Sequence, residues 1–307
     1  MSYRLQDHEA VPEGIKRVVL EQMDTVLHAA QETSGNQDSA VHDARTSLKK
    51  IRAVLRLVQD GIDGDVFRQE NVCFRDAGRH LSAVRDAAVM LETFDKLMER
   101  FSAQLAADAF TGLRKMLRQS STTRRVEKQK ALAVVAKTIS AARRRVEHWP
   151  IHHDGFSALG PGVERAFKRG RRAFAVAVDQ PSVENFHEWR KDVKCLWYQI
   201  RILKPIWPKM MERLADELEA LGDYLSDDHD LAILRERVLE HAGQSDDRTA
   251  LETLVALIDQ RRGELEVEAK RLGARVYGEK PRAFVGRLQA YWQAWRAEVR
   301  ADPIAAI

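Results

Sequence analysis

The sequence is poor in cysteine and has no long apolar run. Its 307 residues include two cysteines, Cys73 and Cys195, which are too few for a disulfide framework. The N-terminal stretch MSYRLQDHEAVPEG lacks the apolar core of a signal peptide, and no segment approaches the roughly 18 consecutive apolar residues that a helix needs to cross a bilayer. We therefore expect a protein of the reducing cytoplasm without a membrane partner.

Glycine and proline are also sparse, and they gather in a few short segments. These segments are VPEG from Val11, DGIDGD from Asp60, HWPIHHDGFSALGPG from His148 and YGEKP from Tyr277. Between them apolar and polar residues alternate with the period of a helix, and no β-branched alternating run indicates a strand. The sequence therefore predicts an all-α fold, and a hydrophobic content of 44% suffices for one large core or two medium ones.

The sequence has little excess of one sign of charge, because the formal net charge is only +4. The cations are nevertheless segregated. Residues 121–145 carry eight lysines and arginines against one acid, Glu127, whereas the stretch ADELEALGDYLSDDHDLA from Ala215 is rich in carboxylates. A modestly basic chain can thus present a strong local positive field.

Three sequence blocks occur twice in the same order. VHDARTSLKKIRAVLRLV from Val41 matches FHEWRKDVKCLWYQIRIL from Phe186, and LSAVRDAAVM from Leu81 matches LSDDHDLAIL from Leu225. Upstream of these, GIKR at Gly14 matches GVER at Gly162. The pattern indicates an internal duplication, with the boundary between the halves in the glycine- and proline-rich cluster near the middle of the chain.

Each copy of the first block places basic side chains along one helical edge. The first stripe consists of His42, Arg45, Lys49, Arg52 and Arg56. On a helix that advances about 100° per residue, these five residues occupy an arc of roughly 80° beside the apolar edge, whereas Lys50 is predicted to point toward solvent. The second stripe consists of His187, Arg190, Lys194 and Arg201. A third basic set, in VERAFKRGRRAF from Val163, consists of Arg165, Lys168, Arg169 and Arg172.

Two interpretations of the stripes remain open, a solvated helix face and an anion-binding surface. A solvated face usually mixes signs, because like charges at i and i+4 repel by a few tenths of a kcal/mol, and neither stripe contains an acid. Asp86 and Asp230, in the second repeated block, are the internal candidates for neutralisation. Two carboxylates cannot balance about eight stripe cations, so the sequence favours an external polyanion.

The repeated pattern resembles the CHAD family, the conserved histidine α-helical domain. H-x-x-R-x-x-x-K/R opens each half and is followed some forty residues later by L-x-x-x-R/H-D-x-x-V/I-L, and YGEKPRAFVGRLQAYWQAW resembles the closing segment of the family. The resemblance covers nearly the whole chain. It implies two pseudo-symmetric four-helix bundles, residues 1–149 and 161–307 with a linker at 150–160, packed around a basic central cleft.

The resemblance also implies a function and a set of binding residues. The expected function is non-catalytic binding of inorganic polyphosphate, for targeting to or organising polyphosphate granules, with polyphosphate-metabolising enzymes as further partners and no cofactor. The residues that match the family motif are His42, Arg45, Lys49, Lys50, Arg52, His187, Arg190, Lys191 and Lys194. Trp197 stands in the second copy where the first has Arg52, which puts one phosphate contact in doubt. Ser82 and Ser226 replace a family glycine.

The role of the two motif histidines stays open at this stage. A bound phosphate would raise the pKa of His42 or His187 and make the ring a further cation. Alternatively, each ring is a helix-start residue that forms a hydrogen bond across its bundle. Histidine-dependent phosphotransfer is a second function to weigh, although no partner or metal site supports it.

Other activities are less well supported by the residues. RNA or single-stranded DNA binding would need aromatic rings among the cations, and only Trp197 and Tyr198 offer them. The string EVEAK at Glu266 matches a triphosphatase signature but lies in a predicted helix, where its carboxylates cannot alternate as on a strand. His152, His153 and Asp154 lack further ligands at metal-binding spacing, and no phosphate-binding glycine loop occurs. We expect no metal and no enzymatic activity.

Overall fold

The computed structural model of the protein describes residues 3–31, 37–82, 86–103, 105, 110–122, 125–241 and 248–301. Within these ranges the regular structure consists of eleven α-helices and three short 3-10 helices, with no strand beyond one isolated bridge between Ile62 and Ile151. The all-α prediction is therefore confirmed for this part of the chain. Its helices include none that is long and apolar enough to cross a membrane.

Four helices from the first part of the chain pack together. They are α1 (Val11–Gln31), α2 (Gln37–Leu57), α3 (Gly64–Ser82) and α6 (Arg125–Glu147). Each presents an apolar face to the others. On α2 the side chains of Val41, Leu48 and Ile51 are buried, and their spacing of seven and three residues places them on one helical face.

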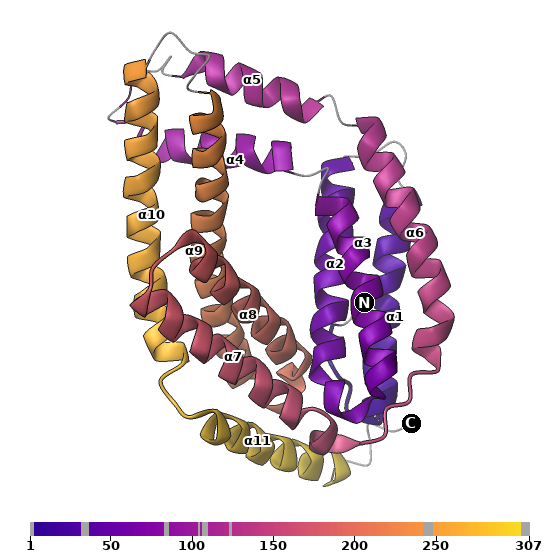
Figure 1. The fold of residues 1–307 in the computed structure, drawn as a ribbon. Coiled ribbons are helices and arrows are strands. Elements are labelled where there is room, and N and C mark those ends of the chain that lie inside the picture. Colours follow the sequence, from indigo (N-terminus) through magenta and orange to yellow (C-terminus); the bar gives the residue numbers. More distant parts are fainter. Residues whose placement is uncertain are drawn as a thin grey trace.

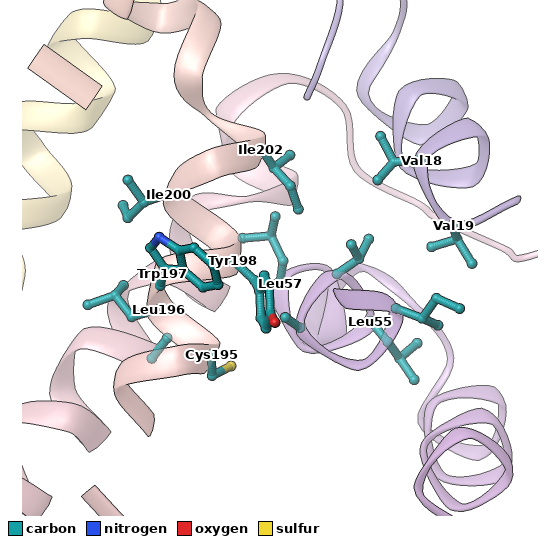
Figure 2. Packing of buried hydrophobic residues seen from close by; sticks show 14 of the residues in the cluster. Val18, Val19, Leu55, Leu57, Cys195, Leu196, Trp197, Tyr198, Ile200 and Ile202 are labelled. Atoms are coloured by element: carbon teal, nitrogen blue, oxygen red, sulfur yellow. The ribbon is translucent and has the colours of Figure 1, made fainter. Parts of the chain in front are cut away.

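The chain then forms a second group of helices that continues the same core. The group consists of α7 (Gly160–Asp179), α8 (Val183–Ile202), the beginning of α9 (Pro208–His241) and α11 (Pro281–Ala301), with the 3-10 helices η1 (Gln59–Gly61), η2 (Gly155–Ala158) and η3 (Lys204–Ile206) at its turns. Figure 2 shows part of this shared core, in which Trp197 and Tyr198 of α8 and Leu55 and Leu57 of α2 are among the buried residues. One apolar core therefore holds α2 against α8.

A separate apolar core lies at the far end of the molecule. It joins α4 (Asp86–Arg100) and α5 (Thr111–Thr122) to the end of α9 and the beginning of α10 (Arg248–Val276). Phe94, Leu117, Leu234 and Ile258 are among its buried side chains. This core thus takes helices from both sides of the linker expected at residues 150–160.

The helices follow one another around a closed loop (Figure 1). α4 and α5 cross one end, α1, α2, α3 and α6 form one side, and α9 and α10 form the other side, with α7, α8 and α11 at the opposite end. The 34 residues of α9 span about 50 Å at 1.5 Å per residue. A helix of this length reaches both cores, so α9 fixes the distance between them.

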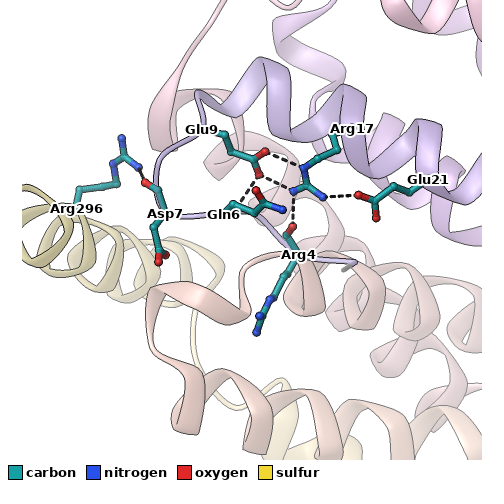
Figure 3. Close-up of polar contacts among 7 residues, drawn as sticks. All are labelled: Arg4, Gln6, Asp7, Glu9, Arg17, Glu21 and Arg296. Carbon is teal, nitrogen blue, oxygen red and sulfur yellow. Dashed lines mark hydrogen bonds and ion pairs between the residues drawn. The ribbon is translucent and has the colours of Figure 1, made fainter. Parts of the chain in front are cut away.

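The N-terminal segment ties α1 to the last helix (Figure 3). Arg17 Nε donates to Glu9 Oε2 over 2.9 Å, and its Nη2 donates to the carbonyl oxygen of Arg4 over 2.8 Å. Arg296 Nη1 of α11 donates to the carbonyl oxygen of Asp7 over 2.8 Å. α11 is therefore held through the segment that precedes α1.

Candidate functional site

The first stripe lies along α2, with its residues at different depths. His42 and Lys49 are exposed, whereas Arg45, Arg52 and Arg56 are half-buried. Burial of the neighbouring apolar face against α1, α3 and α8 sets these depths, because stripe residues next to that face are partly covered by the adjoining helices.

The prediction that Lys50 points toward solvent is wrong. Its Nζ lies 5.2 Å from the centre of the Tyr3 ring, and the Tyr3 hydroxyl donates to the carbonyl oxygen of Lys50 over 3.3 Å. Burial, followed by the nearby Arg201 guanidinium, lowers the pKa of Lys50. The reason is tertiary, since the N-terminal segment folds over this part of α2 and covers a side that the sequence pattern indicates as open.

Arg52 stands at the centre of a cationic group that two helices form. Its Nε donates to Asn71 Oδ1 of α3 over 3.4 Å, a long hydrogen bond. Burial, followed by Arg56 and then Arg75 and Arg79, lowers the pKa of Arg52 to about 10. Sequence reasoning missed Arg75 and Arg79, although their spacing of four residues places both on one face of α3. The guanidinium remains charged at pH 7 and lies half-buried near three other arginines, of which Arg75 and Arg79 share Asp76 as their acidic partner.

Repulsion within this cationic group leads to a prediction for the protein without ligand. Arg52→Met keeps the aliphatic stem and removes the charge, so we expect it to stabilise the free protein by about 1 kcal/mol, or about 2 °C in the midpoint of thermal unfolding. Circular dichroism in low-salt, phosphate-free buffer measures the shift. The exposed Lys137→Met variant is the control, and a midpoint for Arg52→Met below that of the wild type would contradict the expected repulsion.

The second stripe meets a histidine from α9. The ring centres of His187 and His229 are 4.3 Å apart, and Arg190 Nε donates to Ser226 Oγ over 2.9 Å. Burial lowers the pKa of His229 to about 3, with further lowering by Arg190 and His187, then Arg262 of α10 and Lys49 of α2. Side chains from three other helices therefore act on this ring of α9.

His229 and Arg262 are members of this group that sequence reasoning missed. His229 lies in the repeated block LSDDHDLAIL, whose R/H-D step indicates the duplication and the family resemblance but does not by itself point to a binding residue. Arg262 gave no comparable signal, because its Nε donates to the buried Asp228 over 2.9 Å and an arginine on a charged helix is unremarkable in a sequence. Burial raises the pKa of Asp228 to about 6 despite this partner.

Several predicted binding cations have acidic partners within the protein. The pairs are Arg165–Asp60 at 2.6 Å, Arg169–Asp192 at 2.8 Å, Lys191–Glu188 at 2.6 Å and Lys194–Asp223 at 2.9 Å. These acids differ from the expected Asp86 and Asp230. Asp230 lines a cavity together with Lys96, and the side chain of Asp86 lies outside the described residues. Internal neutralisation is therefore more extensive around α7 and α8 than the sequence indicated.

Trp197, which replaces a stripe cation in the second copy, forms cation–π contacts with two cations of the second stripe. Lys194 Nζ lies 4.9 Å and Arg201 Cζ 4.7 Å from its ring centres. Only 8% of Trp197 is exposed, so the ring is not available for stacking with a base. Arg201 also lies 5.8 Å from the Tyr3 ring, which places it beside Lys50.

In the third basic set, Arg165 and Arg169 form ion pairs with acids of the protein, whereas Lys168 and Arg172 are exposed. Arg56, Arg165 and Arg169 line a cavity of about 20 Å³ where α2, α7 and α8 meet, a volume that holds no more than about one water molecule. Lys168 and Arg172 are exposed, and neither forms an ion pair with another described residue. This cavity is thus too small for a phosphate group, and the exposed cations of α7, Lys168 and Arg172, do not line it.

The other motifs have structural partners. EVEAK lies within α10, as predicted, with Lys270 Nζ 3.6 Å from Glu266 Oε2. His152 Nε2 lies 2.8 Å from Asp63 Oδ1, and Asp154 Oδ1 accepts from the amide of Val11. The cluster near the middle of the chain therefore joins the start of α1 to the segment before α3.

A family model of the CHAD domain matches residues 17–239. The chain belongs to the CHAD domain family. The matched range contains both stripes and His229, whereas α10 with Arg262 and α11 lie beyond it.

Two solved structures share the fold. PptA from Streptomyces chartreusis aligns with a TM-score of 0.64 and 16% identity over 88% of this chain and all of that chain. The CHAD domain of the plant Ricinus communis aligns with a TM-score of 0.61 and 16% identity over 90% of this chain and 96% of that chain. A search of curated proteins found no match. At this identity the comparisons establish the fold of the CHAD chain alone.

Proposed function

We propose that this CHAD protein binds inorganic polyphosphate without catalysing a reaction. The observation that carries the proposal is the convergence of cations from several helices on two positions, Arg56, Arg75 and Arg79 around Arg52, and Arg190, Arg262 and Lys49 around His229, which add to the effect of burial on both groups. Repulsion of this kind is relieved by an anion that reaches many cations at once. The proposal places the chain of phosphates in a basic cleft between the halves 1–149 and 161–307, along the first and second stripes.

Polyphosphate suits these residues better than a nucleic acid does. It carries about one negative charge per phosphate and no base, so its recognition depends on placed cations, with arginine forks and lysine point charges holding oxygens. The two aromatic rings beside the second stripe, Trp197 and Tyr198, are both buried, and Lys194 and Arg201 lie against the Trp197 ring. A single-stranded nucleic acid would gain little stacking there, and we propose targeting to polyphosphate granules as the cellular role.

The test is a competition titration of the full chain with long-chain polyphosphate against single-stranded RNA and ATP. The test variant changes Arg45, Lys49, Arg190 and Lys194 to alanine. We expect wild-type binding that survives RNA competition and weakens at least about 100-fold in the variant, equivalent to about 2.7 kcal/mol. The logarithm of the affinity should fall with that of the salt concentration by about 0.7 per phosphate contact on a single-strand scale.

A matched control separates site residues from total charge. Lys137, Lys209, Lys280 and Arg282 are exposed and lie outside the proposed site, and changing all four to alanine removes the same net charge. An equal loss in the control and the test variant would contradict a defined site, as would RNA binding as tight as polyphosphate binding. Phosphotransfer that disappears when His42 and His187 are changed to glutamine would instead favour the alternative function.

A further inference from the structure

The His187 ring of the second stripe packs against the His229 ring of α9, a contact that the sequence pattern of the stripe does not predict. The ring centres are 4.3 Å apart with the planes tilted by 37°. The Nδ1 atoms of both rings are buried and have no hydrogen-bond partner among the described residues. A neutral imidazole has one donor and one acceptor nitrogen, so each ring keeps one buried nitrogen unused and can change its protonation state without breaking a protein hydrogen bond at that atom.

Charges from three helices act on the pair. α8 contributes Arg190, Lys191 and Glu188, α2 contributes Lys49, and α10 contributes Arg262, whose acidic partner Asp228 lies on α9. On α4, Lys96 and Glu92 act on Asp227 of α9 instead. Cations therefore dominate around the rings. Burial and then Arg190 and Lys191 lower the pKa of His187, so both rings are neutral at pH 7 in the absence of an anion.

We propose that the His187–His229 pair is the proton-accepting part of the polyanion site, and that a bound phosphate chain draws one proton onto it. This inference rests on the proposed function. Phosphate oxygens among Arg190, Lys49 and Arg262 reverse the sign of the local field and favour the charged imidazole. Two charged rings 4.3 Å apart repel each other, which limits the uptake to one proton. His187 is the acceptor, because burial and the surrounding cations hold the pKa of His229 at about 3 in the free protein.

The direction of the pH dependence follows from linkage. The pKa of His187 in the free protein lies below its value in the complex, so binding takes up a proton between these two values. Affinity is then greatest below the free value and falls as the pH rises through the bound value, by up to about tenfold per pH unit. Chain-end phosphates, with a pKa of about 6, change in the opposite direction, because nearby cations lower their pKa and release protons.

Isothermal titration calorimetry of the full chain with long-chain polyphosphate tests the inference. Titrations at pH 6.5 in two phosphate-free buffers of different ionisation enthalpy give the number of protons exchanged. We expect the wild type to take up between about half a proton and one proton. His187→Gln should lose this uptake, and the exposed His148→Gln should keep it. NMR of the histidine ring protons in the wild type should show the pKa of one ring rising when polyphosphate is added, a readout that needs no variant.

The remaining outcomes are distinguishable. Absence of polyphosphate binding would overturn the proposed function itself. Binding without proton uptake, or uptake that persists in His187→Gln, would overturn the proton linkage alone. Asp228, whose pKa also lies near neutrality, is the competing acceptor, so uptake lost in Asp228→Asn and retained in His187→Gln would assign the proton to this carboxyl and reject the ring pair.

Discussion

Replacing Arg145 with leucine is expected to destabilise the folded protein by about 3–5 kcal/mol. Arg145 of α6 donates to both carboxylate oxygens of Glu70 on α3, from Nε over 2.6 Å and from Nη2 over 3.0 Å. Only 1% of Glu70 is exposed, so the variant leaves a buried carboxylate without its counter-ion. Urea unfolding followed by circular dichroism at pH 7 measures the loss as a lower midpoint.

Two variants separate the buried pair from a general loss of charge. Arg144 is exposed on the same helix, and Arg144→Leu should change stability by no more than about 0.5 kcal/mol. The double variant Arg145→Leu with Glu70→Leu removes both charges and should recover most of the lost stability. An Arg145→Leu protein as stable as Arg144→Leu would show that water or another group solvates Glu70.

The buried pair also affects the candidate site. It fixes α3 against α6, and α3 carries Arg75 and Arg79 toward Arg52 of α2. The internal pairs around α7 and α8 act in the same way, because Asp192 and Asp60 hold Arg169 and Arg165 in place. Acids of the protein thus position part of the cationic surface.

The sequence was sufficient to predict the helices but not their partners. Glycine and proline clusters and a helical period are local signals, and they indicated the breaks near Asp60, His148 and Tyr277. The packing of α4 and α5 against α9 and α10 depends on apolar faces such as those of Phe94 and Leu234. Such a face matches many others equally well in a sequence, so the second core could not be assigned to particular helices.

The positions of the cations along each helix could be predicted from the sequence, but the contacts between cations of different helices could not. The stripes follow from a spacing of three and four residues, which is a property of one helix. Arg75, His229 and Arg262 joined the site through tertiary contacts that bring α3, α9 and α10 beside α2 and α8. The same cause buried Lys50 and supplied acidic partners from outside the stripes. Whether the two halves are structurally duplicated stays a prediction.

Gly162→Ala is expected to destabilise the protein by about 3 kcal/mol or more, because no space exists for a side chain there. A Cβ at this position would lie 2.6 Å from the carbonyl carbon of Leu57 and 2.7 Å from its Cα, and closer still to its oxygen. These are backbone atoms at the end of α2, so α7 would have to move away from α2. Thermal and urea unfolding of the variant measure the loss.

Two other glycines serve as controls for this prediction. Gly263 within α10 has open space at its Cβ position, so Gly263→Ala should stabilise the protein by up to about 1 kcal/mol through helix propensity. Gly14, the counterpart of Gly162 in the first repeat, would meet only side-chain atoms of Glu9 and Leu5, which can move at lower cost. Gly14→Ala should therefore destabilise less than Gly162→Ala. Equal losses would mean that the α2–α7 contact is no tighter than the contact around Gly14.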